Sequence, residues 1–221
     1  MRIGVIHATL NAVAPLEKAI REISPSAEVC NFVNEELLYH ANRAGGVDDW
    51  GLRNFMRLTM QAAESSVDGI IIACSLYSTY AEQARMLTEK PVIAIDQPMM
   101  ELAVRTGTHI GILATTASSG PAAERKLIKQ AETMQKTITT KIGINTEAMQ
   151  ALKSGDRKRH DELLKETGLS LIKAGCDALV LSQITMASAA EGLKTYGIPV
   201  LSSPQTGAEA IISCLTKSNK E

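Results

Sequence analysis

Short apolar runs alternate with amphipathic stretches along most of the chain. The runs RIGVI, GIIIAC, HIGILAT and ALVLS consist largely of Ile, Val, Leu and Ala, as expected for strands buried on both faces of a parallel sheet. Stretches such as PLEKAIREI, LRNFMRLTMQAAESS, YAEQARMLTE and AAERKLIKQAETM lie between such runs and predict helices. Regular β–α alternation predicts an α/β fold, with helices covering both faces of parallel sheets.

The second half of the chain repeats the first. RIGVIHATL aligns with HIGILATTA at an offset of 107 residues, and VDGIIIACSLYSTYAEQ aligns with CDALVLSQITMASAAEG at an offset of 109. Glu17 matches Glu124 in the first alignment, and Asp68 matches Asp177 in the second. Two matching segments in the same order, at nearly the same offset, indicate two similar α/β lobes.

The repeat predicts two pseudo-symmetric lobes, each a parallel sheet flanked by helices. One lobe would comprise residues 1–95 with 206–221, and the other residues 96–205. In open α/β sheets, ligands bind beyond the carboxyl ends of the strands. Two related lobes that face each other would bring their strand ends together, so we expect the active-site cleft between them.

Composition and charge exclude several classes of function. The net charge is −1 and no basic stripe is visible, so we expect no nucleic-acid partner. The apolar runs are far shorter than a bilayer span, and the chain begins in a strand-like segment without a signal peptide, so we expect a cytoplasmic protein without membrane contact. Cys30, Cys74, Cys176 and Cys214 form no CxxC pair, which argues against a zinc site or a disulfide scaffold and for a reducing cytoplasm.

Cys74 stands where an apolar run ends and small polar residues begin. The loops expected at the carboxyl ends of strands are rich in Ser and Thr and contain no Arg or Lys; they are HATLN, CSLYS, ATTAS and SQITM. Helix N-termini and hydroxyls bind anions, and without basic side chains a small carboxylate fits better than a phosphate. A helix N-terminus would also lower the pKa of the Cys74 thiol and favour a base or nucleophile. A small buried apolar residue is the alternative interpretation of the same cysteine.

These segments resemble the aspartate/glutamate racemase superfamily, which includes hydantoin racemase and arylmalonate decarboxylase. The resemblance covers nearly the whole chain and rests on TLNAVAPL, Cys74-Ser75, IDQPMM and IGILAT. It implies two pseudo-symmetric lobes and catalysis without cofactor or metal. In the family, two cysteines, one per lobe, remove and return the α-proton of a carboxylate substrate from opposite faces. Backbone amides and hydroxyls hold the carboxylate and stabilise the enolate-like intermediate.

The second cysteine of that pattern is a glutamine in this chain. The segment that aligns with GIIIACSLY reads ALVLSQITM, so Gln183 matches Cys74. Glutamine donates and accepts hydrogen bonds but has no proton to transfer near neutral pH. His7, in the first loop, and Thr185 are candidates for the missing acid, and a structural hydrogen bond is the alternative role of His7. In another interpretation Cys74 acts alone, by one-base isomerisation or by covalent addition to an unsaturated acid.

We predict a cofactor-independent racemase or isomerase, without metal, acting at the α-carbon of a small carboxylic acid such as an amino acid or a hydantoin-like compound. The alternatives are a related lyase or decarboxylase, a cis-trans isomerase that uses one cysteine, and a carboxylate-binding relative without turnover. We expect a homo-oligomer, with a dimer favoured. The predicted catalytic residues are Cys74, Gln183 and His7. The predicted substrate-binding residues are Thr9, Asn11, Ser75, Leu76, Thr115, Thr116, Ile184 and Thr185.

Overall fold

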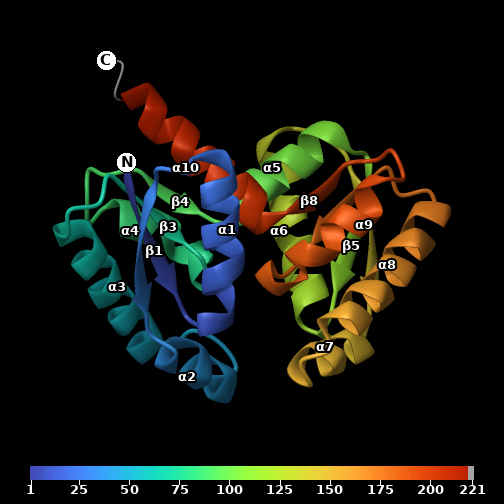
Figure 1. Ribbon diagram of the computed structural model, residues 1–221, viewed down its shortest axis with the longest axis horizontal. Coiled ribbons are helices and arrows are strands. Elements are labelled where there is room, and N and C mark those ends of the chain that lie inside the picture. Colours follow the sequence, from blue (N-terminus) through green and yellow to red (C-terminus); the bar gives the residue numbers. More distant parts are fainter. Residues whose placement is uncertain (219–221) are drawn as a thin grey trace. The chain divides into compact units, whose positions relative to one another are not determined.

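The computed structural model describes residues 1–218, which divide into two compact units. Unit 1 contains Met1–Gln97 and the described residues from Pro204 onward, and unit 2 contains Pro98–Ser203. Each unit is a parallel sheet with helices on its faces (Figure 1). Of the helices formed by residues 1–218, none combines the length and the apolar character that a bilayer span requires.

Unit 1 is a four-stranded parallel sheet in the order β2-β1-β3-β4. Its strands are β1 (Arg2–His7), β2 (Glu28–Val33), β3 (Gly69–Ile72) and β4 (Val92–Ala94). Its helices are η1 (Leu10–Ala12), α1 (Val13–Ile23), α2 (Glu36–Ala44), α3 (Asp49–Glu64), η2 (Tyr77–Tyr80), α4 (Ala81–Arg85) and α10 (Ser203–Ser218), whose first residue belongs to unit 2. Helices α1 and α3 lie on opposite sides of the strands (Figure 1).

Unit 2 repeats this arrangement with the order β6-β5-β7-β8. Its strands are β5 (His109–Ala114), β6 (Thr139–Ile144), β7 (Ala178–Leu181) and β8 (Val200–Ser202). Its helices are α5 (Gln97–Thr106), α6 (Ser119–Thr133), α7 (Thr146–Lys153), α8 (Arg157–Lys173), η3 (Ile184–Ala189) and α9 (Ala190–Lys194). The predicted α/β class, with two parallel-sheet lobes flanked by helices, is confirmed.

The central strand β5 shows why its sequence is almost continuously apolar. Ile110 and Ile112 pack in a cluster with Leu127 of α6, whereas Leu113 packs in a second cluster with Leu164 of α8. Successive strand residues point to opposite faces of a sheet, so helices on both sides bury every residue of β5 after His109.

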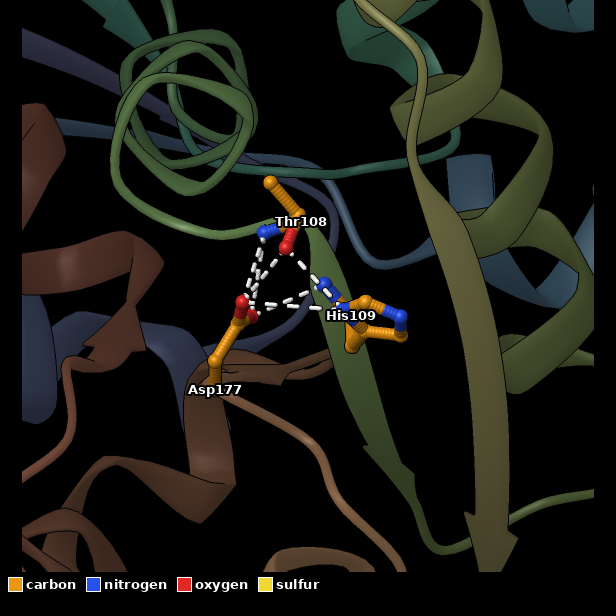
Figure 2. A network of polar contacts seen from close by, with 3 residues as sticks. All are labelled: Thr108, His109 and Asp177. Carbon is orange, nitrogen blue, oxygen red and sulfur yellow. Dashed lines mark hydrogen bonds and ion pairs between the residues drawn. The ribbon is translucent and has the colours of Figure 1, made fainter.

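Asp177 fastens the start of β5 to the start of β7 in unit 2 (Figure 2). Its carboxylate accepts hydrogen bonds from the backbone N–H groups of Thr108 at 3.0 Å and His109 at 2.8 Å, and from the Thr108 hydroxyl at 2.7 Å. The matching residue of unit 1, Asp68, accepts from the backbone N–H of Arg2 at 2.7 Å. The sequence repeat is therefore also a repeat of hydrogen bonds at the start of the central strand.

We expect Asp177→Asn to lower the free energy of unfolding by about 1 kcal/mol at neutral pH, because the lost bonds are charge-assisted but the side chain is 42% exposed. Partial burial raises the pKa of Asp177, but the hydrogen bonds from Thr108 and His109 outweigh it and hold the pKa below 3.8. A lowered carboxyl pKa stabilises the fold above about pH 4, and this stabilisation is lost as pH falls through the folded-state value.

Urea denaturation of both proteins at neutral pH and near pH 3 checks this expectation. The difference between wild type and Asp177→Asn should be smaller at the acidic pH. Asp68→Asn is the matched control in unit 1, and since the Asp68 carboxylate accepts one backbone hydrogen bond, its effect should be smaller. If Asp177→Asn lowered the free energy of unfolding equally at the two pH values, the lowered pKa of Asp177 would be contradicted.

Candidate active site

Cys74 lies just beyond the carboxyl end of β3 in unit 1. The backbone N–H of Ala73 donates to the carbonyl of Ile6 at 2.8 Å, and the carbonyl of Cys74 accepts from the N–H of Ser78 at 2.8 Å. The backbone is therefore held on both sides of the thiol. The side chain is half-buried and packs against the apolar core of unit 1, with part of its surface accessible. This position suits a reactive cysteine better than full burial would.

The segment after Cys74 is predicted as a loop, CSLYS, followed by a helix over YAEQARMLTE, and the α-helix in the structure is shorter than predicted. The segment forms the 3-10 helix η2 and then the short helix α4, which ends at Arg85. The hydroxyl of Ser78 donates to the carbonyl of Ser75 at 2.9 Å, and that of Thr79 to the carbonyl of Leu76 at 2.8 Å. Such bonds offer the backbone an alternative to the α-helix.

His7 is the last residue of β1, so its predicted place in a loop is wrong. Its side chain is fully buried, and its Nε2 lies 3.0 Å from Oδ1 of Asn31 on β2. Asn31 Nδ2 in turn donates to the Glu17 carboxylate of α1 at 2.6 Å. Since that carboxylate only accepts, Asn31 presents its oxygen to His7, and His7 Nε2 must donate. The structure thus shows the structural hydrogen bond that was the alternative role of His7.

Burial lowers the pKa of His7 below 6.5, against the opposing effects of Asn31 and Glu17. A histidine with a lowered pKa stabilises the fold above pH 6.5, and this stabilisation is lost as pH falls through the folded-state value. We therefore expect wild type to lose more unfolding free energy between about pH 7.5 and pH 5 than His7→Gln does. Glutamine can still donate to Asn31 but does not titrate. Urea denaturation at the two pH values measures the difference, and equal losses in the two proteins would rule out a buried neutral His7.

Gln183 lies just beyond the carboxyl end of β7 in unit 2, and its side-chain oxygen is held by three donors. Oε1 accepts from the Thr115 backbone N–H at 3.1 Å and the Thr115 hydroxyl at 2.6 Å, and the single hydrogen of the Ser119 hydroxyl is shared between Oε1 at 3.3 Å and the carbonyl of Thr116 at 3.2 Å. Thr115 is almost fully buried and follows β5 directly, while Ser119 begins α6. The structure therefore brings two of the predicted site residues, Gln183 and Thr115, into direct contact.

The hydroxyls predicted to bind a carboxylate have partners inside unit 2. Thr115 uses its hydroxyl hydrogen on Gln183, and Thr116 Oγ1 accepts from the Ser119 N–H at 3.2 Å in the first turn of α6. Direct contact of Thr115 or Thr116 with a substrate stays a prediction. Ile184 and Thr185 are half-buried at the start of η3.

The remaining predicted residues lie at the corresponding edge of unit 1. Thr9 caps η1, since its hydroxyl accepts from the Asn11 N–H at 3.4 Å, and the Asn11 side chain is exposed. Ser75 is exposed and Leu76 half-buried, next to Cys74 in the chain. All four follow the end of β1 or β3 within a few residues along the chain, and their contact with a substrate stays a prediction.

Three residues that support these sites were not predicted as site residues: Glu17, Asn31 and Ser119. Glu17 carried a signal, because it matches Glu124 in the repeat. The Glu124 carboxylate accepts from the Thr140 hydroxyl at 2.6 Å, so this repeated glutamate bonds to the neighbouring edge strand in both units. Within residues 1–218, no three His, Cys, Asp or Glu side chains are grouped so that they could hold a metal ion.

Comparison with known proteins points to one family. The family model described as Asp/Glu/hydantoin racemase matches residues 3–211. No curated protein sequence matches the chain.

Solved structures of racemases and of a racemase homologue are similar to this chain in fold. Allantoin racemase from Klebsiella pneumoniae is 20% identical with a TM-score of 0.75, covering 99% of this chain and 89% of that one. An aspartate racemase homologue from Pyrococcus horikoshii OT3 is 14% identical with a TM-score of 0.73, covering 97% and 99%. Glutamate racemase RacE1 from Bacillus anthracis is 14% identical with a TM-score of 0.67, covering 98% and 82%. At these identities the likeness establishes the fold.

Proposed function

The chain belongs to the Asp/Glu/hydantoin racemase family, and from that premise we propose that it acts without a cofactor at the α-carbon of a small carboxylic acid. The thiol of Cys74 serves as the base. The observation that supports this role is the half-buried thiol at the carboxyl end of β3, on a backbone held by hydrogen bonds on both sides. Ligands bind at such strand ends in open α/β sheets.

In the proposed reaction the Cys74 thiolate takes the α-proton, and the electron pair of the broken C–H bond moves into the adjacent carboxylate or carbonyl group. A free thiol titrates near pH 8.5, so a useful thiolate fraction is within reach at neutral pH. The resulting enolate carries negative charge on oxygen, and hydrogen-bond donors aimed at that oxygen stabilise it. A racemisation is complete when a proton donor other than Cys74 forms the new C–H bond on the other face of the carbon, and the Cys74 thiol releases its proton to solvent.

A second candidate function is decarboxylation of a malonate-type acid. Gln183 stands where unit 1 has Cys74, and a glutamine offers no transferable proton near neutral pH. Loss of CO2 leaves an enolate that needs only one proton, which the Cys74 thiol can supply. The same glutamine would therefore make racemisation slow without impairing a one-acid reaction.

Incubation in deuterated water with a panel of small α-substituted acids, hydantoins and malonates tests both functions. Chiral chromatography with mass detection follows deuterium uptake and inversion, and CO2 release follows decarboxylation. For a racemase substrate, we expect deuterium to enter one enantiomer faster than that enantiomer is converted to the other. Absence of exchange and of CO2 release across the panel would instead favour a carboxylate-binding relative without turnover.

We propose in addition that the chain forms a homodimer. Light scattering after size-exclusion chromatography measures the mass directly. A mass near the 23.7 kDa of one chain would refute a dimer.

A further inference from the structure

Only one end of the Gln183 amide is engaged within unit 2. Its oxygen accepts three hydrogen bonds, whereas its Nε2 group forms none within residues 1–218. In the described part of the chain, the buried side-chain N and O atoms without a hydrogen-bond partner are His7 Nδ1, His160 Nε2 and Ser182 Oγ. Gln183 Nε2 is not one of them, so it is not a buried donor without a partner. The two N–H groups of Gln183 are therefore open to a ligand.

The orientation of this amide follows from hydrogen-bond chemistry. The backbone N–H of Thr115 is a donor and cannot accept, so the Gln183 atom facing it at 3.1 Å must be the carbonyl oxygen. Reversing the amide would place its NH2 group against that N–H and leave a buried donor unsatisfied, which is unfavourable. Hydrogen bonds to the oxygen also polarise the amide and strengthen its N–H groups as donors.

The internal repeat provides an independent observation. Along the same offsets, Gln183 matches Cys74, Thr115 matches Ala8, and Ser119 matches Ala12. Ala8 and Ala12 are buried and carry no hydroxyl, so the two side-chain donors that hold the glutamine occur only in the unit that has the glutamine. The hydroxyl partners of the Gln183 oxygen are therefore specific to unit 2 and are not a feature that both units share.

We propose that Gln183 is an oxyanion-binding residue whose Nε2 group donates to a carboxylate or enolate oxygen of the ligand. Binding of an enolate oxygen rests on the proposed function, whereas binding of a carboxylate oxygen does not. Because Oε1 is fully occupied, Gln183 accepts no bond from a substrate N–H or O–H group. The group bound here must therefore be an acceptor, which favours a carboxylate and excludes a protonated amine, since an ammonium group can only donate. Thr115 and Ser119 are positioning residues that hold the amide in this orientation.

Gln183→Glu is the decisive variant. Its two carboxylate oxygens keep the shape of the amide, and one of them can accept the same three hydrogen bonds, so the fold should be maintained. The other replaces a donor by a charged acceptor aimed at the ligand. We expect the affinity for malonate, used as the probe, to fall by at least about 100-fold, since like charges placed together cost several kcal/mol. Gln150→Glu, which adds the same charge on the exposed side of α7, is the matched control and should leave the affinity unchanged.

Nitrogen-15 NMR of the wild-type protein measures the binding directly. The side-chain NH2 signals of Gln183 are identified by their loss in Gln183→Glu, and malonate is expected to shift them. Thr115→Val should weaken malonate binding by about 10-fold and broaden or move the same signals, because the amide loses its closest hydroxyl donor. Gln183 signals that stay unchanged at about 100 mM malonate, or equal malonate affinity in Gln183→Glu and wild type, would overturn the proposal.

These outcomes separate the two proposals. If malonate shifts Gln183 and no acid exchanges its α-proton, the oxyanion site stands and the proposed enzyme activity fails. If an acid exchanges its proton in a reaction that depends on Cys74, while Gln183→Glu binds malonate as wild type does, the enzyme activity stands and the role of Gln183 fails.

Discussion

Replacement of Cys74 by serine is expected to slow α-proton exchange of the best substrate by at least about 1,000-fold. A serine hydroxyl is far less acidic than a thiol and supplies almost no anionic base at neutral pH. The side chains are close in shape, and the backbone on both sides of position 74 is held by the hydrogen bonds of Ala73 and Ser78. The free energy of unfolding should therefore change by no more than about 1 kcal/mol.

The measurement is deuterium incorporation by mass spectrometry, with substrate in excess and with urea denaturation as the test of folding. Cys30→Ser is the matched control, because Cys30 is also a half-buried thiol packed against the core of unit 1 but lies within β2. It should retain the wild-type exchange rate. Exchange by Cys74→Ser within about 10-fold of wild type would remove the central claim of the proposed function.

The triple variant Gln183→Cys/Thr115→Ala/Ser119→Ala is expected to raise the ratio of inversion to exchange by at least about 10-fold. It gives the strand ends of unit 2 the residues that unit 1 carries at the matching positions, a cysteine and two alanines. The proposed racemisation lacks a second transferable proton, and a thiol provides one, whereas the amide does not.

Gln183→Cys alone is the informative comparison. It removes the oxygen that accepts from Thr115 and Ser119 and leaves the nearly buried Thr115 hydroxyl without its partner, at a cost of about 1–3 kcal/mol. The triple variant should therefore unfold at higher urea concentration than the single one. Chiral chromatography in deuterated water gives the two rates. An unchanged ratio in the triple variant, with a known substrate, would mean that position 183 has no part in proton transfer even when it carries a thiol.

The sequence was sufficient for the architecture of each unit. Continuous apolar runs such as RIGVI and ALVLS predict strands buried on both faces, and the amphipathic stretches between them predict the covering helices. This works because strand and helix periodicity are local properties of the chain. The repeat also predicted that Gln183 corresponds to Cys74. The two matching segments align without gaps, one from β3 to α4 and the other from β7 to α9.

The local structure after Cys74 was harder to predict, and so was the place of His7. Hydroxyl groups of Ser78 and Thr79 bond to the backbone and favour a 3-10 turn where a loop was predicted, and the spacing of apolar residues gives no sign of such bonds. His7 could be counted as the start of a loop or the end of a strand, because the apolar run gives no sharp boundary. The tertiary structure decides for the strand by pairing His7 with Val33 of β2.

Contacts between distant residues were decided by the tertiary structure alone. His7, Asn31 and Glu17 come from two strands and a helix, and Gln183 reaches Thr115 from 68 positions along the chain. The sequence by itself determined that position 183 carries an amide, which can donate, accept or do both. Only the fold determined that its oxygen is the engaged end, because pairing β7 with β5 sets this atom against a backbone N–H, a group that can do nothing but donate.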